Sequence, residues 1–148
     1  MKKLIITFLL ILFSGLISQA SPMTIQPGTS IGVLTLGLPL QDLFKVMGKP
    51  DGVHKVDKDL RIFMYHKEGL WCLVSKDKVL ELRTSNPEHI ITDTDIHVGS
   101  ILDIKILGRP EGHAQEGLIE RYFYYSKGMT LLVIGNTIIA IVIYEPEI

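Results

Sequence analysis

The segment at residues 28–32 reads Gly-Thr-Ser-Ile-Gly and matches the Gly-x-Ser-x-Gly pattern of a serine nucleophile. That chemistry needs a strained strand-to-helix turn, which presents the serine hydroxyl beside an oxyanion hole. Here Ser30 lies near the start of the mature chain, with no strand expected before it and a strand, not a helix, expected after it. A loop that enters a strand is the preferred interpretation, and a small serine hydrolase is a remote alternative. We therefore predict no enzyme and no catalytic residue.

Metal ligands would have to come from histidines and acids whose spacing is unfavourable. None of the five histidines pairs with a His or Cys at i+3 or i+4, the acids Asp93 and Asp95 lack the Gly and distal Glu of a calcium loop, and Glu116 and Glu120 form an i, i+4 pair of a kind common on solvated surfaces. The sequence thus predicts no metal site and no cofactor. The histidines are His54, His66, His89, His97 and His113.

Aromatic residues give a better candidate, a surface for a protein partner. Phe63 and Tyr65 align with Tyr122 and Tyr124 in a repeated segment, and alternate residues of a strand share one face. With Trp71, and next to Arg61 and Glu120, these rings would suit a protein interface if their face is open.

The alternative is that the same rings fill a core, because strand parity does not say which face the helices cover. If the helices cover the face that carries Leu60, Ile62 and Met64, the aromatic pairs lie on the opposite face. Phe123 and Tyr125, of the other parity, would then join Ile62 and Met64 under the helices.

These candidates lie within an internal duplication. The segment Gly-Lys-Pro-Asp-Gly at residues 48–52 returns as Gly-Arg-Pro-Glu-Gly at residues 108–112, and the surrounding sequence recurs in register. Such a period is typical of two copies of one supersecondary unit packed side by side. Each copy reads as a strand, a helix, a Gly-x-Pro turn and a meander of strands.

The elements follow from apolar spacing. A stripe of Leu40, Leu43, Phe44 and Met47 predicts a helix after Pro39, and a shorter stripe of Ile101, Ile104 and Leu107 predicts a second helix. Strands are expected at 60–66, 70–74 and 79–83, and again at 120–125, 129–134 and 137–144. The run 138–143 is apolar on both parities, so it is either a central strand or one that meets a partner.

The first twenty residues have the composition of a secretory signal peptide. Lys2 and Lys3 precede an apolar run from residue 4 to 17, and Ser18-Gln19-Ala20 forms a small-x-small cleavage site. Removing this segment leaves 13 basic and 16 acidic side chains, a formal charge of −3, which disfavours nucleic acid as a partner. No later segment is apolar enough to span a membrane. We expect an exported protein, periplasmic or extracellular.

Cys72 is the only cysteine of the chain, so no intrachain disulfide can form. It lies in the apolar segment Leu-Trp-Cys-Leu-Val at residues 70–74. A buried small hydrophobic residue is the preferred interpretation, and intermolecular pairing or a reactive thiol are the alternatives.

The duplicated order of elements resembles the fold of beta-lactamase inhibitory protein, in which tandem helix-plus-sheet units form a concave sheet that grips its target. A single unit also resembles the outer-membrane assembly lipoproteins of the SmpA/OmlA type. Those lipoproteins carry a lipidated Cys, whereas Ser21 follows the cleavage site here. Neither family supplies an active site, so the resemblance implies a fold and a binding role only.

Together these arguments predict an α+β fold, with two tandem helix-plus-antiparallel-meander repeats that form one curved sheet with helices on one face. Residues 1–20 are expected to be the signal peptide, and residues 21–148 one domain with repeats at about 24–86 and 90–148. The predicted function is a non-catalytic, inhibitor-like binding module for a protein of the cell envelope. The alternative function is an envelope assembly or scaffolding component acting through residues 138–143.

Overall fold

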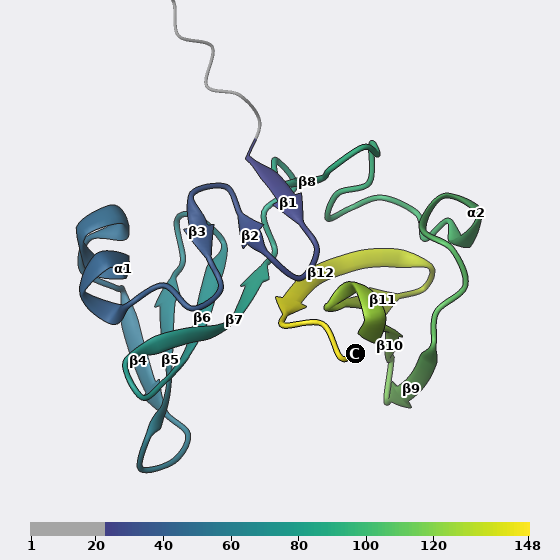
Figure 1. Cartoon of the computed structure of the whole chain (residues 1–148). Coiled ribbons are helices and arrows are strands. Elements are labelled where there is room, and N and C mark those ends of the chain that lie inside the picture. The colour runs from purple at the N-terminus through teal and green to yellow at the C-terminus, as the bar shows by residue number, and fades with distance from the viewer. Residues whose placement is uncertain (1–22) are drawn as a thin grey trace, which may run out of the picture.

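A computed structural model describes residues 23–148, which form two β-sheets and two short α-helices (Figure 1). The predicted signal peptide, residues 1–20, lies outside the described residues. The structure is mostly β, with 48% strand and 12% helix. The predicted α+β fold of helix-plus-meander repeats with helices on one face is therefore wrong.

The larger sheet has eight antiparallel strands in the order β4-β5-β6-β7-β12-β11-β10-β9. Four of them form a first meander and four a second, and β7 and β12 join the two meanders through the paired residues Thr84 with Ile141 to Glu81 with Tyr144. The strands are β4 (Gly52–Lys55), β5 (Leu60–Tyr65), β6 (Leu70–Ser75), β7 (Lys78–Thr84), β9 (Gly112–Glu116), β10 (Ile119–Tyr124), β11 (Met129–Ile134) and β12 (Thr137–Tyr144).

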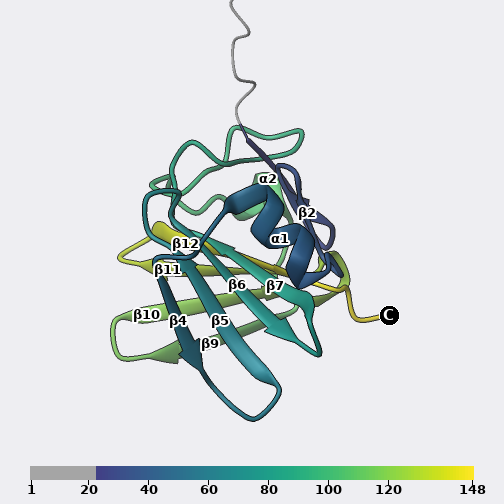
Figure 2. The ribbon, with the colours of Figure 1, turned by 90° about the vertical axis from the view of Figure 1, so that its left-hand side faces the viewer.

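The smaller sheet has the order β3-β2-β1-β8, and it consists of β1 (Thr24–Gln26), β2 (Ser30–Ile31), β3 (Leu34–Thr35) and β8 (Ile90–Ile91). β1 and β8 pair in parallel, so the start of the first repeat and the linker between the repeats lie side by side. Figure 1 shows this sheet above the join between β7 and β12, and Figure 2 shows the first meander crossing the second at an angle. A second sheet, not a pair of long helices, thus covers the join.

The helices are shorter than the covering role predicted for them requires. α1 (Leu40–Met47) begins after Pro39 and ends at Gly48, but only Leu43 of its predicted apolar stripe is buried. α2 (Ile104–Leu107) has four residues, and Leu107 alone is buried while Ile104 is exposed. One turn of helix cannot present a full apolar face, which is why the prediction of two covering helices fails.

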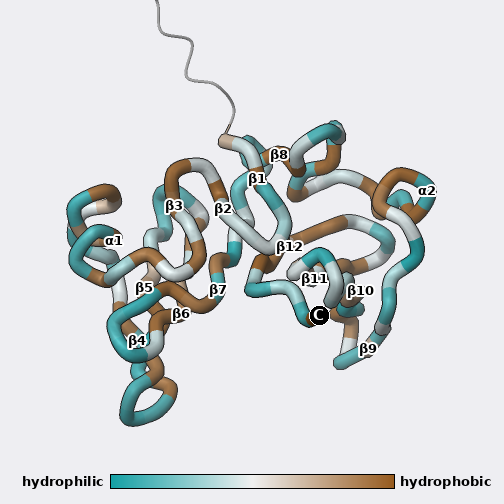
Figure 3. Tube along the Cα trace, in the orientation of Figure 1, coloured by the Kyte–Doolittle hydropathy of each residue, from teal (hydrophilic) through white to brown (hydrophobic). Residues whose placement is uncertain are grey.

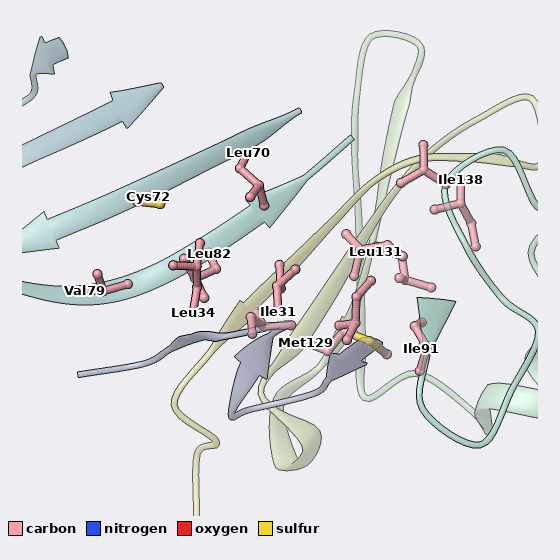
Figure 4. Packing of buried hydrophobic residues seen from close by; sticks show 14 of the residues in the cluster. Ile31, Leu34, Leu70, Cys72, Val79, Leu82, Ile91, Met129, Leu131 and Ile138 are labelled. Atoms are coloured by element: carbon pink, nitrogen blue, oxygen red, sulfur yellow. The ribbon is translucent and has the colours of Figure 1, made fainter. Parts of the chain in front are cut away.

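The main core lies between the two sheets. Ile25, Ile31 and Leu34 of the small sheet are fully buried. Figure 4 shows Ile31 and Leu34 packed near Leu82 and Met129 of the large sheet. Neighbours in the same cluster include Leu70, Cys72, Leu131, Ile138, Ile141 and Ile143.

β12 is central in the large sheet, between β7 and β11. This position accounts for the doubly apolar run at 138–143, because residues of one parity face the main core and Ala140 and Val142 form a second small cluster with Leu132. The hydrophobic colouring along β12 is visible in Figure 3. The central-strand interpretation of this run is therefore the one that the structure supports.

The two meanders repeat several local hydrogen bonds. The N–H of Gly37 donates to the carbonyl of Val79 over 2.7 Å, and the N–H of Gly99 donates to that of Ile138 over the same distance. After each helix a Gly-x-Pro turn leads into an edge strand, β4 in the first meander and β9 in the second. Among residues 23–148, no helix is long and apolar enough to cross a membrane.

Candidate functional site: the open face of the large sheet

The large sheet has one face toward the small sheet and one face without such a cover, which we call the open face. On β5 and β6, the side chains of Phe63, Tyr65 and Cys72 are buried in the core. Trp71, next to Cys72 in the chain, lies on the opposite face of the sheet. The ring of Phe63 also meets Phe44 of α1 edge-on, with centroids 5.5 Å apart. α1 therefore packs on the face of β5 that carries Phe63 and Tyr65. The expectation that the helices cover the face with Leu60, Ile62 and Met64 is wrong.

Three of the five predicted partner-binding residues lie in the core. Phe63 is 3% exposed, and Tyr65 and Tyr124 are each 2% exposed. The two tyrosine hydroxyls donate to the backbone carbonyls of Gly48 and Gly108. These rings fill the core, which is the alternative that strand parity left open.

Tyr122 is half-buried on the covered side of β10, near the edge of the sheet. Its hydroxyl donates to Glu120 Oε2 over 2.8 Å, and His113 Nε2 lies 3.1 Å from the same oxygen. These two hydrogen bonds lower the pKa of Glu120. The cluster is a polar cap on the sheet edge and is separate from the open face.

Trp71 is the one predicted residue that the structure places on the open face. Its side chain is 37% exposed, and the Arg83 guanidinium carbon lies 4.7 Å from the ring centroid. Such a cation–π contact orients the guanidinium group and orders both side chains. The sheet brings the two together because Trp71 and Arg83 are cross-strand partners of β6 and β7.

A cavity of about 340 Å³ lies on the open face over the middle of the sheet. Residues of both meanders and of the segment after β12 line it. The lining residues are Glu81, Arg83, Arg121, Phe123, Tyr125, Thr130, Leu132, Val142, Tyr144 and Glu147. Because Glu81 and Arg83 lie on β7 and Val142 and Tyr144 on β12, the cavity spans the join between the two repeats.

Aromatic rings form one wall of this cavity. Phe123 and Tyr125 stack with centroids 5.2 Å apart and an angle of 8° between the ring planes. Tyr144 is held by its hydroxyl, which donates to the Met129 carbonyl over 3.1 Å. Phe123 and Tyr125 were expected under the helices if the helices covered Ile62 and Met64, so neither was predicted as a binding residue. Their parity, opposite to that of Tyr124, is the signal that marks them once β12 is known to be central.

The ionic groups of the cavity are partly removed from water. Burial lowers the pKa of Arg83, the charge of Glu81 opposes this change, and the charge of Arg121 adds to it. Burial also raises the pKa of Glu81. Within the described chain Arg121 pairs with Glu116 over 3.1 Å, and Arg83 has no carboxylate within 4.0 Å.

The other candidate sites have less chemistry. Ser30 lies on β2, is 7% exposed and donates to Gln26 Oε1 over 3.5 Å; a strand, β1, precedes it, contrary to expectation, and no helix follows directly. No group of three or more metal-ligating side chains occurs in the part of the chain that the structure describes. A larger cavity, of about 510 Å³, lies between the small sheet and β7, but no aromatic ring lines it.

Comparisons with known proteins support the fold alone. No family model and no curated protein matches the sequence. A cysteine-rich secretory protein from Staphylococcus aureus is similar in structure, with a TM-score of 0.52 and 12% identity over 81% of this chain and 48% of its own. A DUF4309 family protein from Bacillus subtilis has a TM-score of 0.53 and 15% identity over 80% of this chain and 88% of its own. The chain thus spans about half the length of the staphylococcal protein.

Proposed function

We propose that the protein is an exported, non-catalytic binding module that recognises a protein partner through the open face of its large sheet. One observation carries this proposal: a cavity on the open face is lined by an arginine from each repeat and by aromatic rings of the second repeat. Arg83 lines one side and stacks on Trp71 next to the cavity, and Phe123 and Tyr125 line the other side. Tyr, Trp and Arg are the residue types that dominate the binding energy of protein interfaces.

The proposed export rests on residues 1–20, which have the pattern of a secretory signal peptide. A rigid sheet suits the proposed role, because its side chains lose little conformational freedom on binding. The stacked rings and the cation–π pair are already ordered by contacts within the chain. The assembly or scaffolding alternative is less well supported, since the strand assigned to it, residues 138–143, lies inside the sheet.

The proposal can be tested by affinity capture with the purified mature protein on envelope extract, followed by identification of the captured protein. The open-face variants Trp71→Ala and Phe123→Ala are compared with Val33→Ala and Leu118→Ala, which truncate exposed apolar residues elsewhere. We expect recovery of the same partner with the wild type and with both controls, and about tenfold less with each open-face variant. Equal recovery with all variants contradicts the proposal.

A further inference from the structure

The open-face cavity has two arginines that reach it from opposite meanders. Arg83 lies on β7 and Arg121 on β10, so β12 and β11 separate them. At about 4.8 Å per strand, the two backbones are roughly 14 Å apart, a span that two extended arginine side chains bridge from both sides. Both guanidinium groups therefore line one cavity although their strands are not neighbours.

The floor between the arginines is made of short side chains. Val142 is the cross-strand partner of Arg83, and Thr130 of β11 is the partner of both Val142 and Phe123. Leu132 pairs in the same way with Ala140 and Arg121. These short side chains leave space between the two long arginine side chains, and this space is the cavity.

The hydrogen-bonding capacity of Arg83 is largely unused within the chain. Its guanidinium group stacks on Trp71 and, among residues 23–148, forms no ion pair within 4.0 Å. Glu81 lies two residues away on the same strand, opposite Tyr144, but among the described residues it forms no ion pair with Arg83. A half-buried guanidinium group with free donors is completed best by a carboxylate, which accepts two parallel hydrogen bonds.

We propose that this cavity receives the carboxylate of an Asp or Glu side chain of the partner, bound by the free donors of Arg83 and facing Arg121, whose guanidinium group also pairs with Glu116. The proposal rests on the proposed function and names the chemistry of the group that is bound. The volume, about 340 Å³, suits one or two side chains. The stacked rings of Phe123 and Tyr125 supply the apolar surface against which the neighbouring residue of the partner packs.

The test uses propionate, which reproduces the end of a Glu side chain, and propionamide, its uncharged isostere. Binding to the purified mature protein at low ionic strength is followed by NMR, through the side-chain Nε–H signals of the arginines and the methyl signals of Val142 and Leu132. We expect saturable shifts at these groups with propionate, and binding at least about tenfold weaker with propionamide.

Two variants remove one guanidinium group each, Arg83→Gln and Arg121→Gln. The matched control is Arg61→Gln, which breaks an exposed ion pair with Asp77 away from the cavity. Each cavity variant should weaken propionate binding about tenfold, and the control should leave it unchanged. No saturable shift with propionate, equal shifts with propionamide, or unchanged binding by Arg83→Gln would each overturn the carboxylate proposal, provided that circular dichroism shows a folded variant.

The two proposals fail separately. Partner capture that requires Phe123 but tolerates both Arg83→Gln and Arg121→Gln would overturn the carboxylate site and leave the binding face in place. In the converse case, propionate binds at the cavity but Trp71→Ala and Phe123→Ala capture as much partner as the wild type. That result would support the carboxylate site and contradict the open face as the partner surface.

Discussion

The Tyr65 hydroxyl donates a hydrogen bond to the backbone carbonyl of Gly48 over 3.2 Å, and Tyr124 makes the same bond to Gly108 over the same distance. Each bond ties the last residue of a strand to the turn that ends a helix. The corresponding tyrosines of the two repeats thus hold the Gly-x-Pro turns in place from inside the core. The rings that the sequence suggested for a partner surface are part of the frame that supports it.

The first prediction concerns these two hydroxyls. Tyr65→Phe and Tyr124→Phe should each lower the free energy of unfolding by about 1 kcal/mol, because each removes one largely buried hydrogen bond and keeps the ring. Urea denaturation followed by circular dichroism measures the change. Tyr125→Phe, on the open face, is the control and should change stability by less than about 0.5 kcal/mol. Stability unchanged in all three variants would contradict the assigned role.

The second prediction concerns Gly128, which has a φ of 62° beside the end of β12. An added Cβ would overlap the carbonyl oxygen of Tyr144 and lie 2.8 Å from the Cα of Gly28. Gly128→Ala should therefore cost about 3 kcal/mol or more of unfolding free energy, as a buried backbone clash does.

Gly135 provides the matched control, because its φ is 54° and nothing lies within 4 Å of an added Cβ. Gly135→Ala should cost only the left-handed strain of an L residue, about 1 kcal/mol. Thermal or urea denaturation compares the two. Equal losses would mean that the close approach of Gly128 to Tyr144 is relieved by a backbone shift.

The third prediction is a pH dependence that arises from His89. This ring is 3% exposed, and its Nδ1 lies 2.5 Å from the Thr84 hydroxyl. That hydroxyl also accepts the N–H of Asn86 over 3.0 Å, so we assign its hydrogen to the bond with Nδ1 of a neutral ring. Burial lowers the pKa of His89 in the folded protein, and the charge of Glu88 opposes the change.

The unfolded chain, with an ordinary histidine pKa of about 6.5, then binds a proton that the folded chain does not. The stabilising contribution of His89 is complete above about pH 6.5 and is lost as the pH falls through that value toward the lower folded pKa. Urea midpoints across this range should fall for the wild type and fall less for His89→Gln. His66→Gln, which changes an exposed residue, should keep the wild-type slope.

The fourth prediction concerns Cys72, whose side chain is fully buried on β6. Burial raises its pKa to about 12, so almost no thiolate exists near neutral pH. The native protein should react with the thiol reagent DTNB only on the time scale of unfolding, and one thiol should react at once in urea. Rapid labelling of the native protein would instead favour the reactive-thiol alternative.

Local signals in the sequence carried part of this structure. The stripe after Pro39 located α1, and the strands expected at 129–134 and 137–144 match β11 and β12. The small sheet could not be read from the sequence in the same way, because its strands have two or three residues and its parallel pair joins Ile25 to Ile91. That pairing is set by tertiary packing and leaves no periodicity to detect.

The site was harder to predict than the elements. Alternation along β5 and β10 grouped Phe63 with Tyr65 and Tyr122 with Tyr124, but the face that each group occupies depends on what covers the sheet. Trp71 was named with this aromatic set, and it is the one member of the set that lies on the open face. Arg83 and Arg121 are three strands apart in the sheet and share a cavity only through the sheet order, which joins the repeats at β7 and β12.

The pairing of β7 with β12 is the hydrogen-bonded join between the repeats in the large sheet, and it runs under the open-face cavity. A partner carboxylate bound between Arg83 and Arg121 would therefore contact both repeats and link them across the β7–β12 pairing. Because it contacts both repeats, its binding would raise the free energy needed to separate them.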